Sequence, residues 1–492
     1  MMHEPLFDFD NSYARLPDAF YRRVLPTPVS RPGLIAFNAA LAAELGLYLE
    51  GVNDAERANI FSGNHIPQGA DPIAMAYAGH QFGHFVPLLG DGRAILLGEV
   101  INRKGERRDI QLKGCGQTAF SRRGDGRAAL GSVVREYIVS EAMHALGIRT
   151  TRSLAAITTG EQVYRETPLP GAVLTRIAAS HIRIGTFEYF AAQGDYEAVA
   201  RLADYVIERH YPAVKTAADP YAALLQRVIE AQAMLVASWM HVGFIHGVMN
   251  TDNMAVSGET IDYGPCAFMD IYDPLRVFSS IDHHGRYAFS RQPSIAQWNL
   301  TRFAETLLPL LSPDKTESVG KAEQLLAIFP ELFRKHFLSG MRRKIGLATA
   351  ADTDMALINE LLNLMYSSNA DYTLSFRSLC NAATGNDTAL QQLFADKAAL
   401  QAWLKLWHER LGKQPQSPAQ CAELMRSANP AYIPRNHRIE EAIEAAVSNN
   451  DFSVMQQLMK VLSQPYREQD DFTAYALPPI PSERVYQTFC GT

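Results

Sequence analysis

The amino-acid sequence predicts an α+β protein in which a small mixed β/α lobe is followed by a large, mainly helical lobe. Three observations support this: an apolar strand hairpin near residue 100, a long apolar helix that begins near residue 220, and amphipathic helices from about residue 293 to residue 462. The chain of 492 residues exceeds the length at which one hydrophobic core usually stops growing. We therefore expect two or three lobes that share extensive interfaces.

The hairpin is predicted over residues 94–113. Residues 94–101 are apolar, residues 102–105 have turn composition, and residues 109–113 alternate between apolar and polar side chains. Successive strand side chains point to opposite sides, so Ile110 and Leu112 share one face and Lys113 lies on the other. Lys113 is therefore expected to point away from the apolar face.

A helix is predicted over residues 131–146, with Glu136 in its early turns and Gly147 as its stop. Short extended segments follow at residues 154–159, 162–166 and 172–177, separated by Gly and Pro turns. These elements complete the small lobe.

The helical lobe is predicted to contain a deeply packed helix that starts at Asp219, an N-cap followed by Pro220, and runs to about His241. One stripe of this helix is mostly apolar. From Pro293 to about Leu462 the pattern predicts further amphipathic helices, and a Pro-rich tail follows.

The composition is that of a globular protein, with 47% hydrophobic and 20% charged residues. The net charge is -6 and no block of like charges is present, which argues against nucleic-acid binding. The first 21 residues are acidic rather than basic, unlike an export signal, and the apolar stretch 231–247 is too short and too interrupted to span a membrane. We expect a cytoplasmic protein that binds neither nucleic acid nor membranes. No sequence feature indicates an oligomeric state.

The five cysteines are scattered and form no CxxC pair, so neither a zinc site nor a disulfide framework is indicated. Cys490, third from the C-terminus, is expected to be exposed, and the others are expected to be buried thiols: Cys115, Cys266, Cys380 and Cys421.

The most informative motif covers residues 246–253, His-Gly-Val-Met-Asn-Thr-Asp-Asn, and is followed by Asp262-Tyr263-Gly264. Protein kinases carry H-R-D-L-x-x-x-N and D-F-G at this spacing, with the Asn and the second Asp holding metal ions. Asn253 and Asp262 keep these positions, but Val248 replaces the kinase catalytic Asp. An amide and a carboxylate oxygen suit Mg²⁺ or Mn²⁺ bound to nucleotide phosphates. The motif predicts a metal–nucleotide site without the usual kinase base.

Upstream residues fit the same template. Lys113 stands where kinases have the lysine of V-A-I-K, and Glu136 stands at the position of its partner. Such a pair could instead lie on the surface, where it would contribute at most about 1 kcal/mol. The downstream motif favours the functional interpretation.

Two glycine-rich segments and two arginines could complete a phosphate site. Backbone N–H groups of such segments can approach phosphate closely, and guanidinium groups can bind it bidentately. Alone, each is also explained by an ordinary turn or a surface arginine. The candidates are Gly90, Gly92 and Arg93 in the first segment, Asp125 and Gly126 in the second, and Arg176 and Arg183.

Two histidine pairs do not indicate a metal site. His80 and His84 have the spacing of H-E-x-x-H, but Gln81 replaces the general-base Glu and Gly83 weakens the required helix. We reject a zinc protease. Residues 283–284 are adjacent histidines that do not face the same way, and a loop role is preferred.

Taken together, the motifs resemble the selenoprotein O family over nearly the whole chain: Gln-Leu-Lys-Gly at 111–114, Arg-Gly-Asp-Gly-Arg at 123–127, residues 246–253, and Asp-Tyr-Gly-Pro at 262–265. The resemblance implies a protein-kinase-like bilobal fold that binds ATP turned around relative to kinases and transfers AMP to Ser, Thr or Tyr hydroxyls of proteins. It implies an N-terminal extension (1–80), an N-lobe (81–180), a C-lobe (181–292), and a helical extension with tail (293–492).

Carried onto this sequence, the resemblance implies that Asp252 accepts the proton, that Asn253 and Asp262 hold Mg²⁺ or Mn²⁺, and that Glu136 fixes Lys113. ATP is the implied substrate and proteins are the implied acceptors. The nucleotide would be bound by Gly90, Gly92, Arg93, Lys113, Asp125, Gly126, Arg176, Arg183 and Asp262.

Named members of the family carry selenocysteine where Cys490 stands here. We hypothesise a reversible pairing of Cys490 with Cys266, which lies just beyond Asp262 and could gate the site. Two other functions stay open: a phosphotransferase that uses Asp252 as base, and a non-catalytic scaffold, suggested by Val248.

Overall fold

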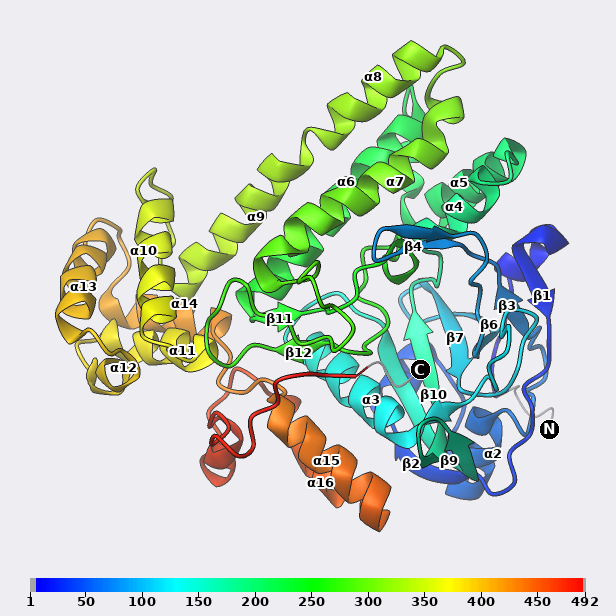
Figure 1. Ribbon diagram of the computed structural model, residues 1–492, viewed down its shortest axis with the longest axis horizontal. Helices are drawn as coiled ribbons and strands as arrows, with labels where there is room; N and C mark the ends of the chain where they lie inside the picture. The colour runs from blue at the N-terminus through cyan, green and yellow to red at the C-terminus, as the bar shows by residue number, and fades with distance from the viewer. Residues whose placement is uncertain (1–5, 490–492) are drawn as a thin grey trace.

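An antiparallel sheet forms the first part of the computed structural model, which describes residues 6–489 (Figure 1). The strand order is β1-β3-β6-β7-β10-β9-β2, and β8 pairs with β10. The strands are β1 (Tyr21–Arg23), β2 (Gly33–Phe37), β3 (Ile73–Met75), β6 (Ala94–Ile101), β7 (Arg107–Lys113), β8 (Ala128–Ala129), β9 (Arg152–Tyr164) and β10 (Pro168–Ala178).

The predicted hairpin and the predicted helix are both confirmed. Strands β6 and β7 pair from Ala94 opposite Lys113 to Ile101 opposite Arg107. The helix is α3 (Leu130–Ala145), which is buried along most of its length, Glu136 included.

One prediction in this region was wrong. Residues 154–159 and 162–166 belong largely to a single strand, β9, which continues through Gly160. Gly160 has φ +72°, and the pairing register shifts opposite it, so it forms a bulge and not a chain-reversing turn. The turn to β10 comes at residues 165–167 instead.

The first 80 residues contribute β1, β2 and β3 to this sheet. They also form α1 (Ala39–Leu45) and α2 (Asp54–Ser62), which cover the sheet face that carries Ile110 and Leu112. Lys113 lies on the other face, towards α3, as the alternation in the sequence predicts.

The helical part begins with α4 (Ile184–Ala191) and α5 (Tyr196–His210) and is built around α6 (Pro220–His241), whose N-cap Asp219 accepts a hydrogen bond from the backbone N–H of Ala222. Helix α6 packs against α7 (Gln292–Leu311) and α9 (Phe329–Lys344), with α8 (Lys315–Leu326) between them in sequence. The predicted long helix is therefore confirmed. The loop after it contains two short strands, β11 (Phe244–Ile245) and β12 (Ala267–Phe268), which pair with each other.

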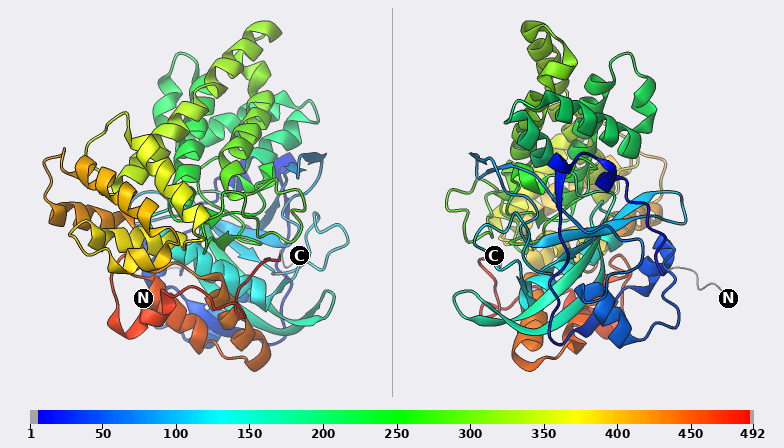
Figure 2. Two further views of the ribbon diagram at one scale, coloured as in Figure 1. Left: turned by 60° about the vertical axis from the view of Figure 1, so that its left-hand side comes forward. Right: turned by 90° about the vertical axis from the view of Figure 1, so that its right-hand side faces the viewer.

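The remaining helices form a second core and then return to the sheet, as Figure 2 shows for α15 and α16. Both of these helices pack on α3, and Glu440 of α15 pairs with Arg135. The elements are α10 (Asp354–Ser367), α11 (Tyr372–Ala382), α12 (Thr388–Leu393), α13 (Lys397–Leu411), α14 (Pro418–Ala428), α15 (Asn436–Asn449) and α16 (Ser453–Leu462). Within residues 6–489, none of the helices combines the length and apolar character needed to cross a membrane.

Candidate functional site

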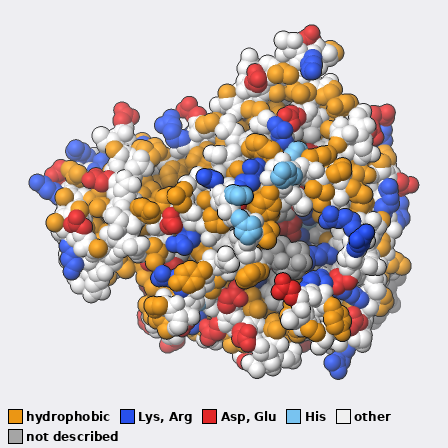
Figure 3. Space-filling model, viewed as in Figure 1, with side chains coloured by type: hydrophobic (Ala, Val, Ile, Leu, Met, Phe, Trp, Pro, Cys, Tyr) orange, Lys and Arg blue, Asp and Glu red, His pale blue; other side chains and the backbone are white. Residues whose placement is uncertain are grey.

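A cavity of about 690 Å³ lies where the sheet meets the loop that follows α6. Its walls come from the glycine-rich residues 90–93, the segment 120–127, the inner ends of β7 and β10, and the loop residues 248–265. Figure 3 shows this face of the molecule, which is hollowed near its middle between Lys and Arg side chains on one side and His side chains on the other.

The cavity brings together the residues that the sequence motifs singled out. Glu136 stands behind Lys113, and Cys266 is buried next to Pro265, which is part of the wall. Cys490 lies outside the described residues, so its pairing with Cys266 stays a prediction. The predicted residues in the lining are Gly90, Gly92, Arg93, Lys113, Asp125, Gly126, Arg176, Arg183, Asp252, Asn253 and Asp262.

Three cations converge on Asp262. The Nζ atom of Lys113 lies 2.7 Å from Glu136 Oε2 and 3.3 Å from Asp262 Oδ1. Arg176 pairs with both of these carboxylates, and Arg183 lies 2.9 Å from Asp262 Oδ2. The predicted ion pair between Lys113 and Glu136 is therefore present, and it is buried.

These charges stabilise one another. Burial alone would raise the pKa of Asp262, but Arg176, Lys113 and Arg183 outweigh it and hold that pKa well below its usual value. Burial would also raise the pKa of Glu136, but Arg176 and Lys113 outweigh it and lower that pKa. The pKa of Lys113 is lowered by burial and by repulsion from Arg176. Asp262 is thus an ionised carboxylate already surrounded by positive charge.

The loop before Asp262 is fixed by His246. Its ring Nε2 lies 2.9 Å from the carbonyl oxygen of Ile261, and burial lowers its pKa, so the ring is neutral and donates this bond. Asp262 itself has φ +64°, a left-handed conformation that Asp tolerates better than most residues. His246 thereby holds the two halves of the motif together.

Asn253 is oriented by its own loop. Its Nδ2 donates to the carbonyl oxygen of Val248 at 3.0 Å, which leaves the amide oxygen to act as a ligand. Among the described residues, no group of three or more His, Cys, Asp or Glu side chains could hold a metal ion. The amide oxygen of Asn253 and the carboxylate of Asp262 are the donor types that Mg²⁺ or Mn²⁺ accepts beside phosphate and water oxygens.

Asp252 differs from Asp262 in charge and surroundings. Burial raises the pKa of Asp252 to about 7, although Arg183 opposes the shift. Its Oδ1 is buried and has no hydrogen-bond partner within the described part of the chain, and its Oδ2 lies 3.5 Å from Gln81 Nε2. A carboxyl with a pKa near neutral and an open acceptor position can take up a proton at physiological pH.

The sequence interpretation missed a hairpin that covers the loop of Asp252. The residues rejected as a zinc motif form β4 (Gly79–Gln81) and β5 (His84–Val86), joined by Phe82 and Gly83, whose φ values are +52° and +88°. A methyl group on Gly79 would collide with the Asp252 carboxylate, so the two segments approach as closely as their backbones allow. Gly83, which argued against a helix here, lies in the turn of this hairpin.

Hydrogen bonds tie this hairpin to the loop. The N–H of His80 donates to Thr251 Oγ1 at 2.7 Å, and that of Phe82 donates to Asn250 Oδ1 at 3.0 Å. Glu188 on α4 bonds to Thr251 and lies 2.5 Å from His80 Nδ1. Glu188 lies 63 residues from Thr251, and no sequence pattern pointed to it.

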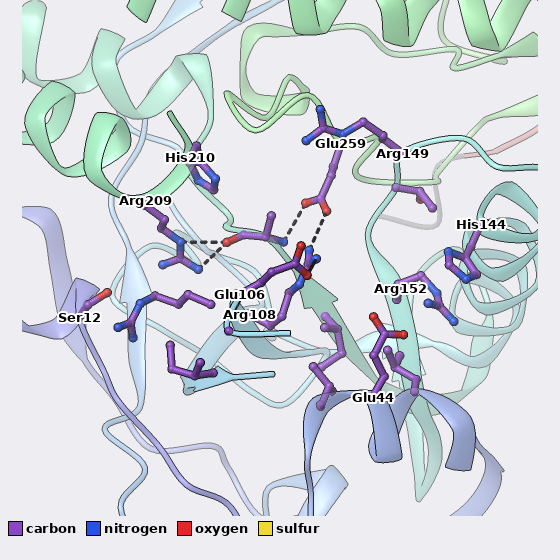
Figure 4. Close-up of a pocket in the computed structure, with 18 of the residues that line it drawn as sticks. Ser12, Glu44, Glu106, Arg108, His144, Arg149, Arg152, Arg209, His210 and Glu259 are labelled. Atoms are coloured by element: carbon purple, nitrogen blue, oxygen red, sulfur yellow. Dashed lines mark hydrogen bonds and ion pairs between the residues drawn. The ribbon is translucent and has the colours of Figure 1, made fainter. Parts of the chain in front are cut away.

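A larger cavity of about 930 Å³ lies near α1, α5 and the edge of β7 (Figure 4). Several arginines line it, and carboxylates already partner most of them; Arg149 donates to the carbonyl oxygen of Ser257. Arg108 lies 2.6 Å from Glu106, Arg152 lies 2.7 Å from Glu141, and Arg209 lies 3.0 Å from Glu99. These ion pairs join neighbouring elements and leave little excess charge for a ligand.

Comparison with known proteins agrees with the motifs. The family model described as "Protein adenylyltransferase SelO" matches residues 6–463. A "Protein nucleotidyltransferase YdiU" from Rhizobium rhizogenes is 60% identical over 494 residues, covering 100% of this chain and 98% of that protein. Proteins of the same name from Rhizobium meliloti and a Bradyrhizobium species are each 61% identical, over 99% of both chains.

Proposed function

This chain belongs to the SelO family of adenylyltransferases, and from that premise we propose that it transfers AMP from ATP to Ser, Thr or Tyr hydroxyls of proteins and releases pyrophosphate. One observation carries the proposal: a cavity with three cations around the Asp262 carboxylate also contains Asp252, a second carboxyl whose pKa is about 7. We also propose that the fold is kinase-like and bilobal. The protein would be cytoplasmic and would act on proteins and not on nucleic acid.

Lys113, Arg176 and Arg183 would bind the phosphates. In the structure these three cations form ion pairs with Asp262. The phosphate oxygens of a bound triphosphate would bind these cations more strongly than Asp262 does. The Asp262 oxygens would then be available to other ligands. Glu136 keeps Lys113 and Arg176 in place during this exchange, because it bonds to both.

Asn253 and Asp262 would hold Mg²⁺ or Mn²⁺. When bound, the metal neutralises charge on the phosphates and orients them. The glycine-rich residues 90–93 and 124–126 contribute close backbone approach to the nucleotide, with Arg93 and Asp125 in the same walls.

Asp252 would accept the proton of the attacking hydroxyl. The hydroxyl oxygen attacks the α-phosphorus, the bond from that phosphorus to the bridging oxygen breaks, and pyrophosphate leaves with the bond electrons. The cationic cluster stabilises the leaving group as its charge develops. Val248, which occupies the kinase base position, takes no part, and this agrees with a nucleotide that presents its α-phosphate to Asp252.

Two parallel labelling experiments test the proposal. The protein is incubated with a bacterial lysate and with ATP labelled at either the α- or the γ-phosphate. Label from the α-position in protein bands, lost in Asp252→Asn and Asp262→Asn variants, supports AMP transfer. Label from the γ-position alone would make the protein a phosphotransferase, and no label from either would favour a scaffold.

A further inference from the structure

The β4–β5 hairpin and the loop 281–286 form one side of the cavity, next to Asp252. Gln81 and Phe82 of the hairpin line the cavity, and so does Ile281 of the loop. Under the proposed function, the nucleotide contacts the glycine-rich walls and the cationic cluster. The hairpin and this loop are then the wall over which an acceptor protein can bring its hydroxyl to Asp252.

Arg286 is a fixed cation beside the hairpin turn, next to residues that line the cavity. Its guanidinium lies 4.8 Å from the ring centroid of Trp298 and 5.7 Å from that of Tyr287. It also lies 3.6 Å from the point where a Cβ on Gly83 would stand, beside the hairpin turn. Stacking on aromatic faces holds the group in place without neutralising it.

Arg286 has unused binding capacity. Among residues 6–489 no carboxylate forms an ion pair with it; its side chain bonds to that of Tyr287, and its buried Nε has no hydrogen-bond partner there. By contrast Arg302, the other cation on Trp298, is paired with Glu305 at 2.7 Å. A stacked arginine with no carboxylate partner is prepared to bind one from outside.

The hairpin and the loop beside Arg286 carry little negative charge and include exposed apolar side chains. Glu188 and Glu305, on helices packed nearby, are already paired with His80 and Arg302. Residues 79–88 and 281–291 contain one carboxylate, Asp282, which is buried and accepts hydrogen bonds from the backbone N–H groups of Arg286 and Tyr287. Phe85 is 40% exposed and Ile281 is 49% exposed. Exposed apolar area beside a lone cation is typical of a protein-binding surface.

We propose that Arg286, Phe85 and Ile281 form an acceptor-binding surface that selects protein segments with a carboxylate next to the acceptor hydroxyl. Arg286 forms the ion pair with this carboxylate, and Phe85 and Ile281 contact an apolar neighbour. The inference rests on the proposed function and adds its substrate class: acidic and not basic acceptor segments.

Synthetic peptides test this surface. Each peptide contains one acceptor residue (Ser, Thr or Tyr) flanked by Asp, by Asn or by Lys, and transfer from α-labelled ATP is measured as kcat/KM. The wild type is expected to prefer the Asp peptides over the Lys peptides by at least about tenfold, the equivalent of one buried charge-assisted contact. Raising the salt concentration should reduce this ratio.

Variants assign the preference to Arg286. Arg286→Gln is expected to remove it, and Arg286→Glu to reverse it in favour of Lys peptides. Lys405→Glu on α13, a charge reversal at an exposed site outside the cavity lining, should leave the preference unchanged. ATP binding and the unfolding midpoint are measured for every variant, so that a folding defect is recognised.

Three outcomes overturn the inference: equal use of all peptides by the wild type, a preference that survives Arg286→Glu, or labelling of lysate proteins with no labelling of any peptide. In each of these, AMP transfer itself still occurs and the proposed function stands. Absence of α-label from both lysate proteins and peptides removes the proposed function and this inference together.

Discussion

Replacement of Asp262 by Asn should separate nucleotide binding from catalysis. The change leaves Lys113 and Arg176 with Glu136 as their shared carboxylate partner, and Arg183 with Asp91 at 3.9 Å. The metal loses its carboxylate ligand, so AMP transfer is expected to disappear. The variant site, however, carries one fewer negative charge, so metal-free ATP should bind to the variant more tightly than to the wild type.

The magnitude follows from Coulomb's law. Two unit charges about 6 Å apart interact by about 3 kcal/mol at an effective dielectric constant of about 20. The cavity is open to solvent, so we take half of this value, about 1.4 kcal/mol, or a tenfold lower Kd. The free protein should lose about 2–3 kcal/mol of stability, less than the 3–5 kcal/mol typical of a fully buried pair, because 21% of the Asp262 side chain is exposed.

Titration calorimetry with ATP in excess EDTA measures the affinity, and urea unfolding measures the stability. Asp71→Asn is the matched control, because Asp71 pairs with Arg23 at 3.1 Å and does not line the cavity. This control variant should change the Kd for metal-free ATP by less than about threefold. Unchanged or weaker ATP binding by Asp262→Asn would refute the assignment of these cations to the phosphates.

Other variants test the surroundings of the site. His80→Ala should lower AMP transfer by about tenfold or more with little change in ATP affinity, because its ring bonds to Glu188 and so helps to hold the hairpin over the loop of Asp252; a change in affinity alone would contradict this role. Burial lowers the pKa of Lys344 to about 7 from 10.5. Between pH 7 and pH 10 the unfolded chain binds one more proton than the folded protein, so the free energy of unfolding of the wild type should rise by about 1.4 kcal/mol per pH unit relative to that of Lys344→Met. Urea unfolding measures this difference at pH 7 and pH 9, and an equal difference at both pH values would contradict the shifted pKa. Non-reducing mass mapping is expected to find Cys266 linked to Cys490, and two thiols that are always free would remove that hypothesis.

Much of the cavity could be predicted because its residues lie in local patterns. The alternation of β7 placed Lys113 on the face opposite Ile110 and Leu112, and the spacing of the loop after α6 placed Asn253 and Asp262 together. These predictions depend on a few neighbouring residues and on the fixed geometry of strands. Tertiary packing did not need to be known.

Other features depend on contacts between distant segments, which no local pattern encodes. Helix α15 packs on α3 through Arg135 and Glu440, which are 305 residues apart. The spacing of His80 and His84 was rejected as a zinc-protease helix, but no pattern predicted the hairpin at residues 79–86, and only its packing on the loop of Asp252 reveals it. Gly160 was read as a turn, but pairing with β10 on one side and β2 on the other keeps β9 continuous.

The central claim is that the α-phosphate of ATP, and not the γ-phosphate, faces Asp252. A crystal structure with a non-hydrolysable ATP analogue and Mg²⁺ tests it directly. We predict that the β- and γ-phosphates contact Lys113, Arg176 and Arg183, and that the α-phosphorus lies beside the open position at Asp252. A γ-phosphate beside Asp252, with the α-phosphate on the cationic cluster, would contradict the account.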